Sequence, residues 1–125
     1  MNDAAFIKLD SSKREIAALL QNLSLSRIES LAMTCLIDGD SLTSSQIENL
    51  TGLRQPEVSV AMKPLCKKGI VESWDQKLSK DRGRPRRYYK LKLTFDTFMR
   101  NLENDISAEI ECKSHALNRL KQICN

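Results

Sequence analysis

The sequence predicts a mainly α-helical fold with one small β-hairpin, an α+β architecture in a chain of 125 residues, the length of one domain. Helix-capping signals and apolar residues at helical spacing recur from Ser12 to Lys68 and again from Thr94 to the C-terminus. Between these regions, two segments rich in β-branched and aromatic residues flank a polar connection that contains Gly83 and Pro85. These observations predict helices at both ends of the chain and a hairpin between them.

Three capping boxes, each a hydroxyl residue followed three residues later by Glu or Gln, predict three helix starts in the first half of the chain. They are Ser12-x-x-Glu15, Ser26-x-x-Glu29 and Thr43-x-x-Gln46. The apolar residues after each box are spaced to face inward: Ile16, Leu19, Leu20 and Leu23; Ile28, Leu31, Ala32, Cys35 and Leu36; Ile47 and Leu50. We expect Gly39 to end the second helix and Gly52 to supply the turn after the third.

A fourth helix is predicted from about Gln55 to Lys68, with Gly69 at its end. Its inward-facing residues are Val58, Met62 and Leu65. Pro64 falls inside this helix, where its ring removes the hydrogen bond to the carbonyl of Val60 and crowds the preceding turn. We therefore expect a kink near residues 60–63 or an early end to the regular helix.

Two strands are predicted on either side of the polar connection, in "IVESWDQK" and "RRYYKLKL". Tyr88 and Tyr89 alternate faces in the second strand, so one of them should pack on the core beside Trp74. From Thr94 onward, apolar residues recur three, four or seven apart. A helix of about thirty residues is ~45 Å long, more than a compact domain of this size can cover. We therefore expect a homodimer held by the 94–125 helix, with support from the 12–23 helix.

Positive charge is concentrated in one segment, Lys77 to Lys92, which we call the basic segment. It contains eight basic residues and one acidic residue, a net charge of +7, whereas the rest of the chain nets −3. A solvated surface is the ordinary interpretation of such a run. The arginines of "RGRPRR" favour contact with phosphates or a nucleic-acid groove, because a guanidinium fork matches those acceptors. The local field should attract a negative partner.

Several other classes of protein are disfavoured. No apolar run approaches the length that spans a bilayer and "MNDAAFIKLD" is not a signal peptide, so we expect a cytoplasmic protein with no membrane partner. No phosphate-binding loop, catalytic carboxylate pair or nucleophile–base pair is present, so we expect neither an enzyme nor a cofactor. The four cysteines have no metal-site spacing and predict free thiols without a metal, although a redox switch remains open. Cys112 and His115 would share a helix face, which makes a metal site there a weak alternative.

The middle of the chain resembles the winged helix-turn-helix domain of MarR-like and TrmB-like transcriptional regulators, with a looser likeness to the PadR and ArsR groups. The resemblance is carried by "LTSSQIENLTGLRQPEVSVAMKPLCKKGIVES", from Leu42 to Ser73, and by "GRPRRYYKL", from Gly83 to Leu91. It implies a DNA-binding domain over residues 26–93, an N-terminal helix over 1–25 that supports dimerisation, and a C-terminal dimerisation helix over 94–125. An ArsR-like metal sensor is less favoured, because only Cys66 lies near the proposed recognition helix.

In a helix-turn-helix, the N-terminal part of the second helix enters the major groove. With Val58, Met62 and Leu65 in the core, the outer side of that helix carries Gln55, Glu57, Ser59, Val60 and Lys63. Gln55 can read base edges, Ser59 suits a base or a phosphate, and Lys63 suits a phosphate. Arg54 lies at the turn, where similar proteins often have a serine cap, and can reach the DNA backbone. The alternative is that Gln55 and Ser59 are only polar surface.

The resemblance places the basic segment in the wing, the hairpin that lies over the adjacent minor groove or the backbone. Its Gly-Arg-Pro core is also similar to an AT-hook. Arg84 and Arg86 are the candidates for the minor groove, and Lys80, Arg82 and Arg87 for phosphates. The predicted function is that of a dimeric, sequence-specific regulator that binds double-stranded DNA. The alternative is an architectural or RNA-binding protein that uses the wing without sequence preference. The sequence identifies no small-molecule effector.

Overall fold

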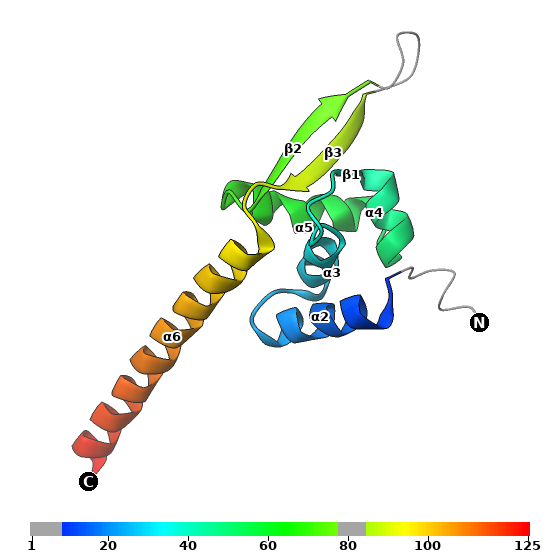
Figure 1. Cartoon of the computed structure of the whole chain (residues 1–125). Helices are drawn as coiled ribbons and strands as arrows, with labels where there is room; N and C mark the ends of the chain where they lie inside the picture. Colours follow the sequence, from blue (N-terminus) through cyan, green and yellow to red (C-terminus); the bar gives the residue numbers. More distant parts are fainter. Residues whose placement is uncertain (1–8, 78–84) are drawn as a thin grey trace. The chain divides into compact units, whose positions relative to one another are not determined.

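The computed structural model describes residues 9–77 and 85–125 of the chain (Figure 1). Their elements are α2 (Ser11–Asn22), α3 (Arg27–Cys35), β1 (Leu42–Thr43), α4 (Ser44–Thr51), α5 (Gln55–Lys67), β2 (Val71–Gln76), β3 (Arg86–Leu91) and α6 (Phe95–Cys124). The chain divides into two compact units, one that ends at Phe95 and one that spans Asp96–Asn125. The first unit holds the four shorter helices and the sheet, and the second is the body of α6.

Helix α2 begins one residue earlier than the predicted capping box. Asp10 is its N-cap, and the Asp10 carboxylate accepts a hydrogen bond from the Lys13 backbone N–H at 2.8 Å. The prediction of a box at Ser12 and Glu15 is therefore wrong: Asp, a strong capping residue, precedes the serine. Ala17 and Leu20 are buried on the side that packs against α3, whereas Leu19 and Leu23 are exposed in the single chain.

The other two capping boxes are confirmed. The Ser26 hydroxyl accepts a hydrogen bond from the Glu29 N–H at 3.2 Å, and the Glu29 carboxylate accepts one from the Ser26 N–H at 3.0 Å. Thr43 and Gln46 make the same reciprocal pair at 3.1 and 2.8 Å. Helix α4 then ends at Gly52, whose φ of 79° lies in the left-handed region that glycine adopts without a Cβ clash. This tight turn places α5 directly after α4.

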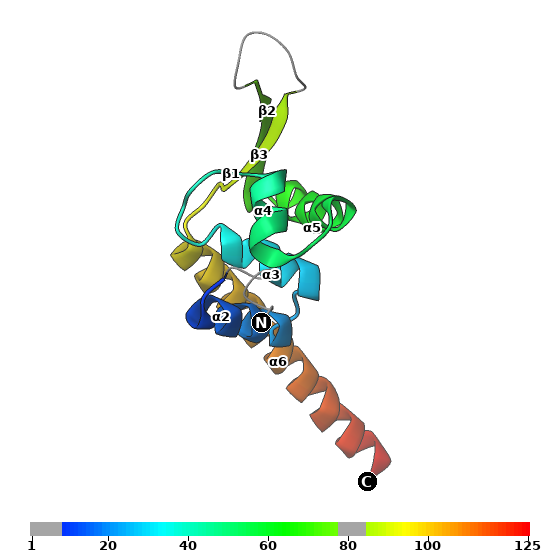
Figure 2. The ribbon, with the colours of Figure 1, turned by 90° about the vertical axis from the view of Figure 1, so that its right-hand side faces the viewer.

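The core lies between α3, α4, α5 and the sheet. Its fully buried side chains include Met33 and Leu36 of α3, Ile47 of α4, and Val58 and Met62 of α5. Full burial of a side chain of this size contributes roughly 1.5–3 kcal/mol. The predicted inward face of α5 is confirmed, because its third member, Leu65, is also buried. Figure 2 shows α3 beneath α4 and α5, with α2 on the far side of α3 from the sheet.

Helix α5 continues past Pro64 to Lys67, so the predicted early end is wrong. Proline removes only its own N–H bond, and its carbonyl still accepts one from the Lys68 N–H at 3.0 Å. The chain then turns at Gly69, as expected, with a φ of 79°. The expected kink near residues 60–63 stays a prediction. The candidate contacts from Gln55 to Lys63 all lie within this continuous α-helix.

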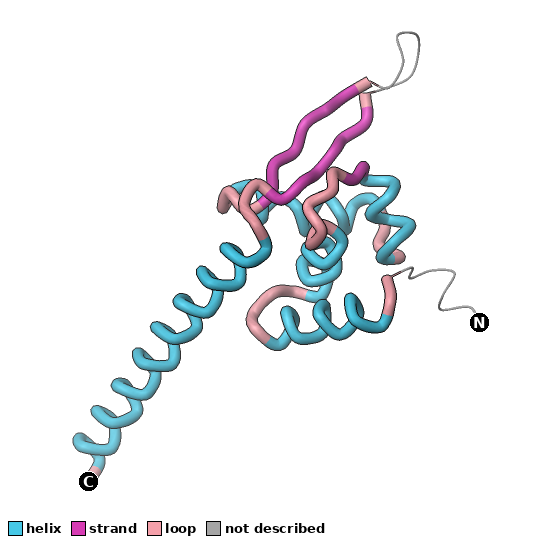
Figure 3. The backbone as a smooth tube through the Cα atoms, viewed as in Figure 1, coloured by secondary structure: helices cyan, strands magenta, loops and turns pink. Residues whose placement is uncertain are grey.

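The sheet has three antiparallel strands in the order β1–β3–β2 (Figure 3). The two longer strands match the predicted hairpin, whereas the two-residue β1 was not predicted. Tyr89 is buried on the core face, while Tyr88 lies on the opposite face and stacks on Trp74 with ring centroids 5.7 Å apart. One tyrosine, Tyr89, packs on the core as predicted, but the tyrosine beside Trp74 is Tyr88. Alternate residues of a strand point to opposite faces, so both roles cannot fall to one side chain.

Helix α6 is a single helix of 30 residues, as the apolar spacing predicts. Its apolar side chains in the C-terminal half are more than half exposed in the single chain: Ile110, Leu117, Leu120 and Ile123.

No helix among residues 9–77 and 85–125 combines the length and the apolar character that crossing a membrane requires.

Candidate nucleic-acid interface

The outward side of α5 carries most of the predicted contact residues. Gln55, Ser59 and Lys63 are four residues apart and therefore share one side of the helix. All three side chains are exposed. Val60 lies beside this row, with 61% of its surface exposed, so its methyl groups face solvent in the single chain. The regular helix thus presents amide, hydroxyl, ammonium and methyl groups in its first three turns.

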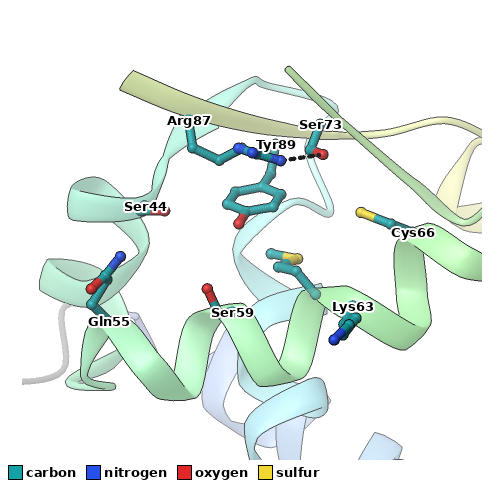
Figure 4. Close-up of a pocket in the computed structure, with 9 residues that line it drawn as sticks. Ser44, Gln55, Ser59, Lys63, Cys66, Ser73, Arg87 and Tyr89 are labelled. Atoms are coloured by element: carbon teal, nitrogen blue, oxygen red, sulfur yellow. Dashed lines mark hydrogen bonds between the residues drawn. The ribbon is translucent and has the colours of Figure 1, made fainter. Parts of the chain in front are cut away.

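Gln55, Ser59 and Lys63 form one side of an open groove of about 460 Å³, which we call the helix–hairpin groove (Figure 4). The other α5 residues in its lining are Met62 and Cys66. The opposite side is formed by Ser44 of α4, Ser73 of β2, and Arg87 and Tyr89 of β3. The lining includes two cationic side chains and no acidic one. The groove is therefore polar and lined by cationic groups of the kind that contact a polyanion. One of the two cations, Arg87, forms an ion pair with Asp75 outside the lining.

Arg87 lines this groove from the hairpin side. Its Nε lies 2.8 Å from Oδ1 of Asp75, and its Nη1 donates to the Ser73 hydroxyl at 3.3 Å. Asp75 is the residue directly opposite Arg87 in the β2–β3 ladder, so both side chains share one face of the sheet. The close-up in Figure 4 shows the Arg87 side chain above the α5 residues, beside Tyr89. The structure therefore brings a predicted wing residue into the same groove as the predicted contact residues of α5.

Glu57 occupies a different position from the other predicted α5 residues. Its Oε1 accepts a hydrogen bond from the Arg54 backbone N–H at 2.9 Å, and its Oε2 lies 3.4 Å from Nη2 of Arg27 in α3. Both oxygens are therefore used within the protein, at the start of the helix. Glu57 does not line the helix–hairpin groove, and Arg54, at the N-cap of α5, is exposed beside it.

The remaining predicted wing residues separate into two groups. Arg86 is exposed at the start of β3, opposite Gln76 and on the sheet face that does not meet the groove. Lys80, Arg82 and Arg84 lie outside the described residues. Sequence reasoning missed the hairpin and α4 residues of the groove, Ser44, Ser73 and Tyr89. It also missed Asp75, which lies outside the lining and pairs with Arg87. The alternation of β3 places Tyr89 beside Arg87, but the register with β2 was needed to find Ser73 and Asp75.

The four cysteines are free thiols in different surroundings. Burial raises the pKa of Cys35 to about 12, although nearby Lys13 acts in the opposite direction. The Lys13 ammonium donates to Asp38 at 2.8 Å, and this hydrogen bond raises the pKa of Lys13. Cys66 is half-buried in the groove, and the other two cysteines are exposed on α6. Within residues 9–77 and 85–125, no three His, Cys, Asp or Glu side chains are grouped to hold a metal ion.

Comparison with models of protein families gives no match, and comparison with curated protein sequences gives none either. Among solved structures, the chain is similar to the crystal structure of the transcriptional regulator PA3341. The two share 21% sequence identity with a TM-score of 0.50, and the match covers 90% of each chain. At this identity the likeness concerns the fold. Helices α4 and α5, the turn at Gly52 and the β2–β3 hairpin together form a winged helix-turn-helix fold.

Proposed function

We propose that the protein is a transcriptional regulator that binds double-stranded DNA in a sequence-specific manner. In this proposal α5 enters the major groove, and the β2–β3 hairpin with its basic loop lies on the adjacent minor groove or backbone. One observation carries the proposal: exposed Gln55, Ser59 and Lys63 share a polar groove with Arg87 of the hairpin. The regulator named for the similar solved structure adds support, since the two chains share the fold.

The chemistry of the exposed groups suggests a role for each. The Gln55 amide both donates and accepts, which suits an adenine edge, and Ser59 suits a base or a phosphate. Lys63, Arg54 and the loop residues Lys80 and Arg82 supply positive charge for the DNA backbone. We place Arg84 and Arg86 in or beside the minor groove, where narrow A·T-rich tracts concentrate negative potential. Glu57 acts within the protein rather than on the bases, because its carboxylate is held by Arg27 and the Arg54 N–H.

We further propose that the protein acts as a homodimer. Residues 94–125 would form the dimerisation helix, 1–25 would support it, and 26–93 would bind DNA. The exposed apolar row of α6 supports this division, because several large apolar side chains on one side of a helix favour burial against a second helix. A two-fold dimer would present two copies of α5 to two half-sites. The finer resemblance, to MarR-like and TrmB-like regulators, belongs to the same proposal.

Selection of bound duplexes from a random pool tests the proposal. A sequence-specific regulator should enrich one motif, and a two-fold dimer should enrich it as two related half-sites about one helical turn apart, or a multiple of that spacing. An architectural protein would retain duplexes without an enriched motif, and an RNA-binding protein would prefer RNA in a parallel selection. Either of those outcomes would reject sequence-specific regulation. The selected motif also supplies the cognate duplex for the measurements below.

A further inference from the structure

We infer that Asp75 and Ser73 are positioning residues that hold Arg87 beside α5, so that its guanidinium binds a DNA phosphate next to the recognition helix. The inference rests on the proposed function and deepens it. The sequence pattern grouped Arg87 with the other arginines of "RGRPRR". The inference gives Arg87 a different role, at a fixed position beside α5. It also gives Asp75 a role in DNA recognition, although the negative charge of Asp75 by itself would repel DNA.

The strand register places the three residues together. Asp75 pairs with Arg87, and Ser73 pairs with Tyr89 two residues further along β3. Because side chains alternate along a strand, all four point to one face, and that face looks onto α5. Arg86 falls on the opposite face. The groove-facing position of Arg87 therefore follows from backbone register, and the 2.8 Å contact with Asp75 then sets where its guanidinium lies.

The contacts of the guanidinium leave it able to bind an anion. A guanidinium has five N–H groups. Asp75 engages the one on Nε, and Ser73 engages one on Nη1, so these two contacts leave three N–H groups at the outer end. Two of them can form the parallel fork that a phosphate accepts. The side chain is about half exposed, so this outer end is accessible from the groove.

The physical benefit of the Asp75 contact is a reduction in the freedom of Arg87. A long arginine side chain loses rotamer entropy when a ligand fixes it, and a side chain that is already fixed loses less. A phosphate contact made from a fixed position also sets the register of the protein on DNA. In contrast, the Asp75 charge weakens the attraction of the hairpin for any polyanion. If Asp75 positions Arg87, removal of its carboxylate should weaken DNA binding. If only its charge matters, the same removal should strengthen DNA binding.

The test compares Asp75→Asn with Glu72→Gln by fluorescence anisotropy on the cognate duplex and on a scrambled one. Both substitutions remove one negative charge from β2, but Glu72 is on the opposite face of the sheet, opposite Lys90. Glu72→Gln should leave binding unchanged or strengthen it slightly on both duplexes. Asp75→Asn should weaken cognate binding by about 2- to 5-fold, the scale of an exposed ion pair. On the scrambled duplex, where no base contacts fix the register of the protein, the position of Arg87 should matter little, and Asp75→Asn should behave like Glu72→Gln.

Substitutions of Arg87 and Ser73 test whether Asp75 acts through Arg87. In an Arg87→Ala background, Asp75→Asn should cause no further loss of cognate affinity. Arg87→Lys keeps the charge without the fork, so it should preserve the salt dependence but lower the ratio of cognate to scrambled affinity. Ser73→Ala should act in the same direction as Asp75→Asn, with a smaller effect. A loss of folding stability alone would lower the active fraction on both duplexes equally and leave this ratio unchanged.

The outcomes separate the inference from the proposed function. If the wild-type protein shows no preference for the cognate duplex, both are wrong. If it shows that preference but Asp75→Asn and Ser73→Ala both bind as tightly as Glu72→Gln, only the positioning role is wrong. A clear gain in cognate affinity for Asp75→Asn would mean that Asp75 masks Arg87. If Asp75→Asn still lowers cognate affinity in the Arg87→Ala background, Asp75 does not act through Arg87. This result would also overturn the inference.

Discussion

Individual residues of α5 divide into those that face the groove and those that hold the helix in place. Gln55 and Ser59 are exposed on the groove side, where they have space to meet a base edge. Glu57, only two residues from each of them, instead uses both carboxylate oxygens within the protein. The sequence pattern had grouped all three, because it separates core from surface but does not distinguish one exposed side of a helix from another.

Gln55→Ala tests the groove-side assignment. An amide that reads a base makes short-range hydrogen bonds, so its loss should lower the ratio of cognate to scrambled affinity by ~1–3 kcal/mol. Binding to scrambled duplexes should change little, since Gln55 carries no charge. Anisotropy titrations on the two duplexes give the ratio. Equal losses on both duplexes would show that Gln55 does not read sequence.

Glu57→Gln tests whether Glu57 acts within the protein rather than on DNA bases. Glutamine keeps an oxygen that can accept the Arg54 N–H but removes the negative charge that pairs with Arg27. The ion pair is partly exposed, so the free energy of unfolding should fall by less than ~1 kcal/mol. Thermal or urea unfolding followed by circular dichroism measures this change. The ratio of cognate to scrambled affinity should stay at the wild-type value, and a drop of tenfold or more would place Glu57 at the bases instead.

Cys35 gives a prediction about alkaline pH. Burial raises its folded-state pKa to about 12 from the ordinary 9.0, so the folded protein favours the neutral thiol. Its contribution to stability is therefore complete below pH 9 and is lost as the pH rises toward 12. Over that window the free energy of unfolding should fall by roughly 1.4 kcal/mol per pH unit from this group. In urea denaturation from pH 8 to 11, Cys35→Ala should show a shallower decline, and equal slopes would contradict the burial argument.

At the scale of elements, the sequence predicts those whose signals are local. The boxes at Ser26 and Thr43 predicted the starts of α3 and α4, and Gly52 predicted the turn before α5. Gly39 was wrong as the end of α3, because that helix ends at Cys35. Local rules failed where a stronger neighbour competed, as Asp10 did with Ser12, and where a long helix tolerated Pro64. Local rules could not predict the two-residue β1, because its pairing with β3 is a long-range contact. The groove lies beyond local rules for the same reason, since β-sheet register brings Ser73 and Asp75 to Arg87.

In the proposed function, the hairpin makes a second kind of DNA contact. Substitution of Lys80 and Arg82 by alanine should weaken binding to every duplex, because phosphate contacts carry no sequence information. The dependence of log Kd on log salt concentration should flatten by up to ~1 unit for each lost phosphate contact. Anisotropy over a salt series measures this slope. If alanine at Arg82, Arg84, Arg86 and Arg87 together changes neither affinity nor slope, the basic segment is only solvated surface.

At the scale of the whole molecule, the proposed dimer depends on α6. Leu117 lies in its exposed apolar row, whereas Ala108 lies on the other side of the same helix by its 3.6-residue period. Leu117→Lys should therefore weaken the proposed dimer, and Ala108→Lys, which adds the same charge, should not. Sedimentation at micromolar concentration distinguishes a dimer from the 14.2 kDa monomer. A wild-type protein that sediments only as the monomer would contradict the dimer.

The central claim is that α5 and the hairpin form one surface that reads a DNA sequence. The measurement that tests it most directly is the ratio of the wild-type dissociation constants for a scrambled and a cognate duplex, at physiological salt. Specific DNA-binding proteins show ratios of about 10³ or more, because base contacts add to the phosphate contacts that every duplex offers. We expect a ratio in that range, and we expect it to fall when Gln55 is replaced by alanine. Equal affinity for the two duplexes across the whole salt series would contradict it.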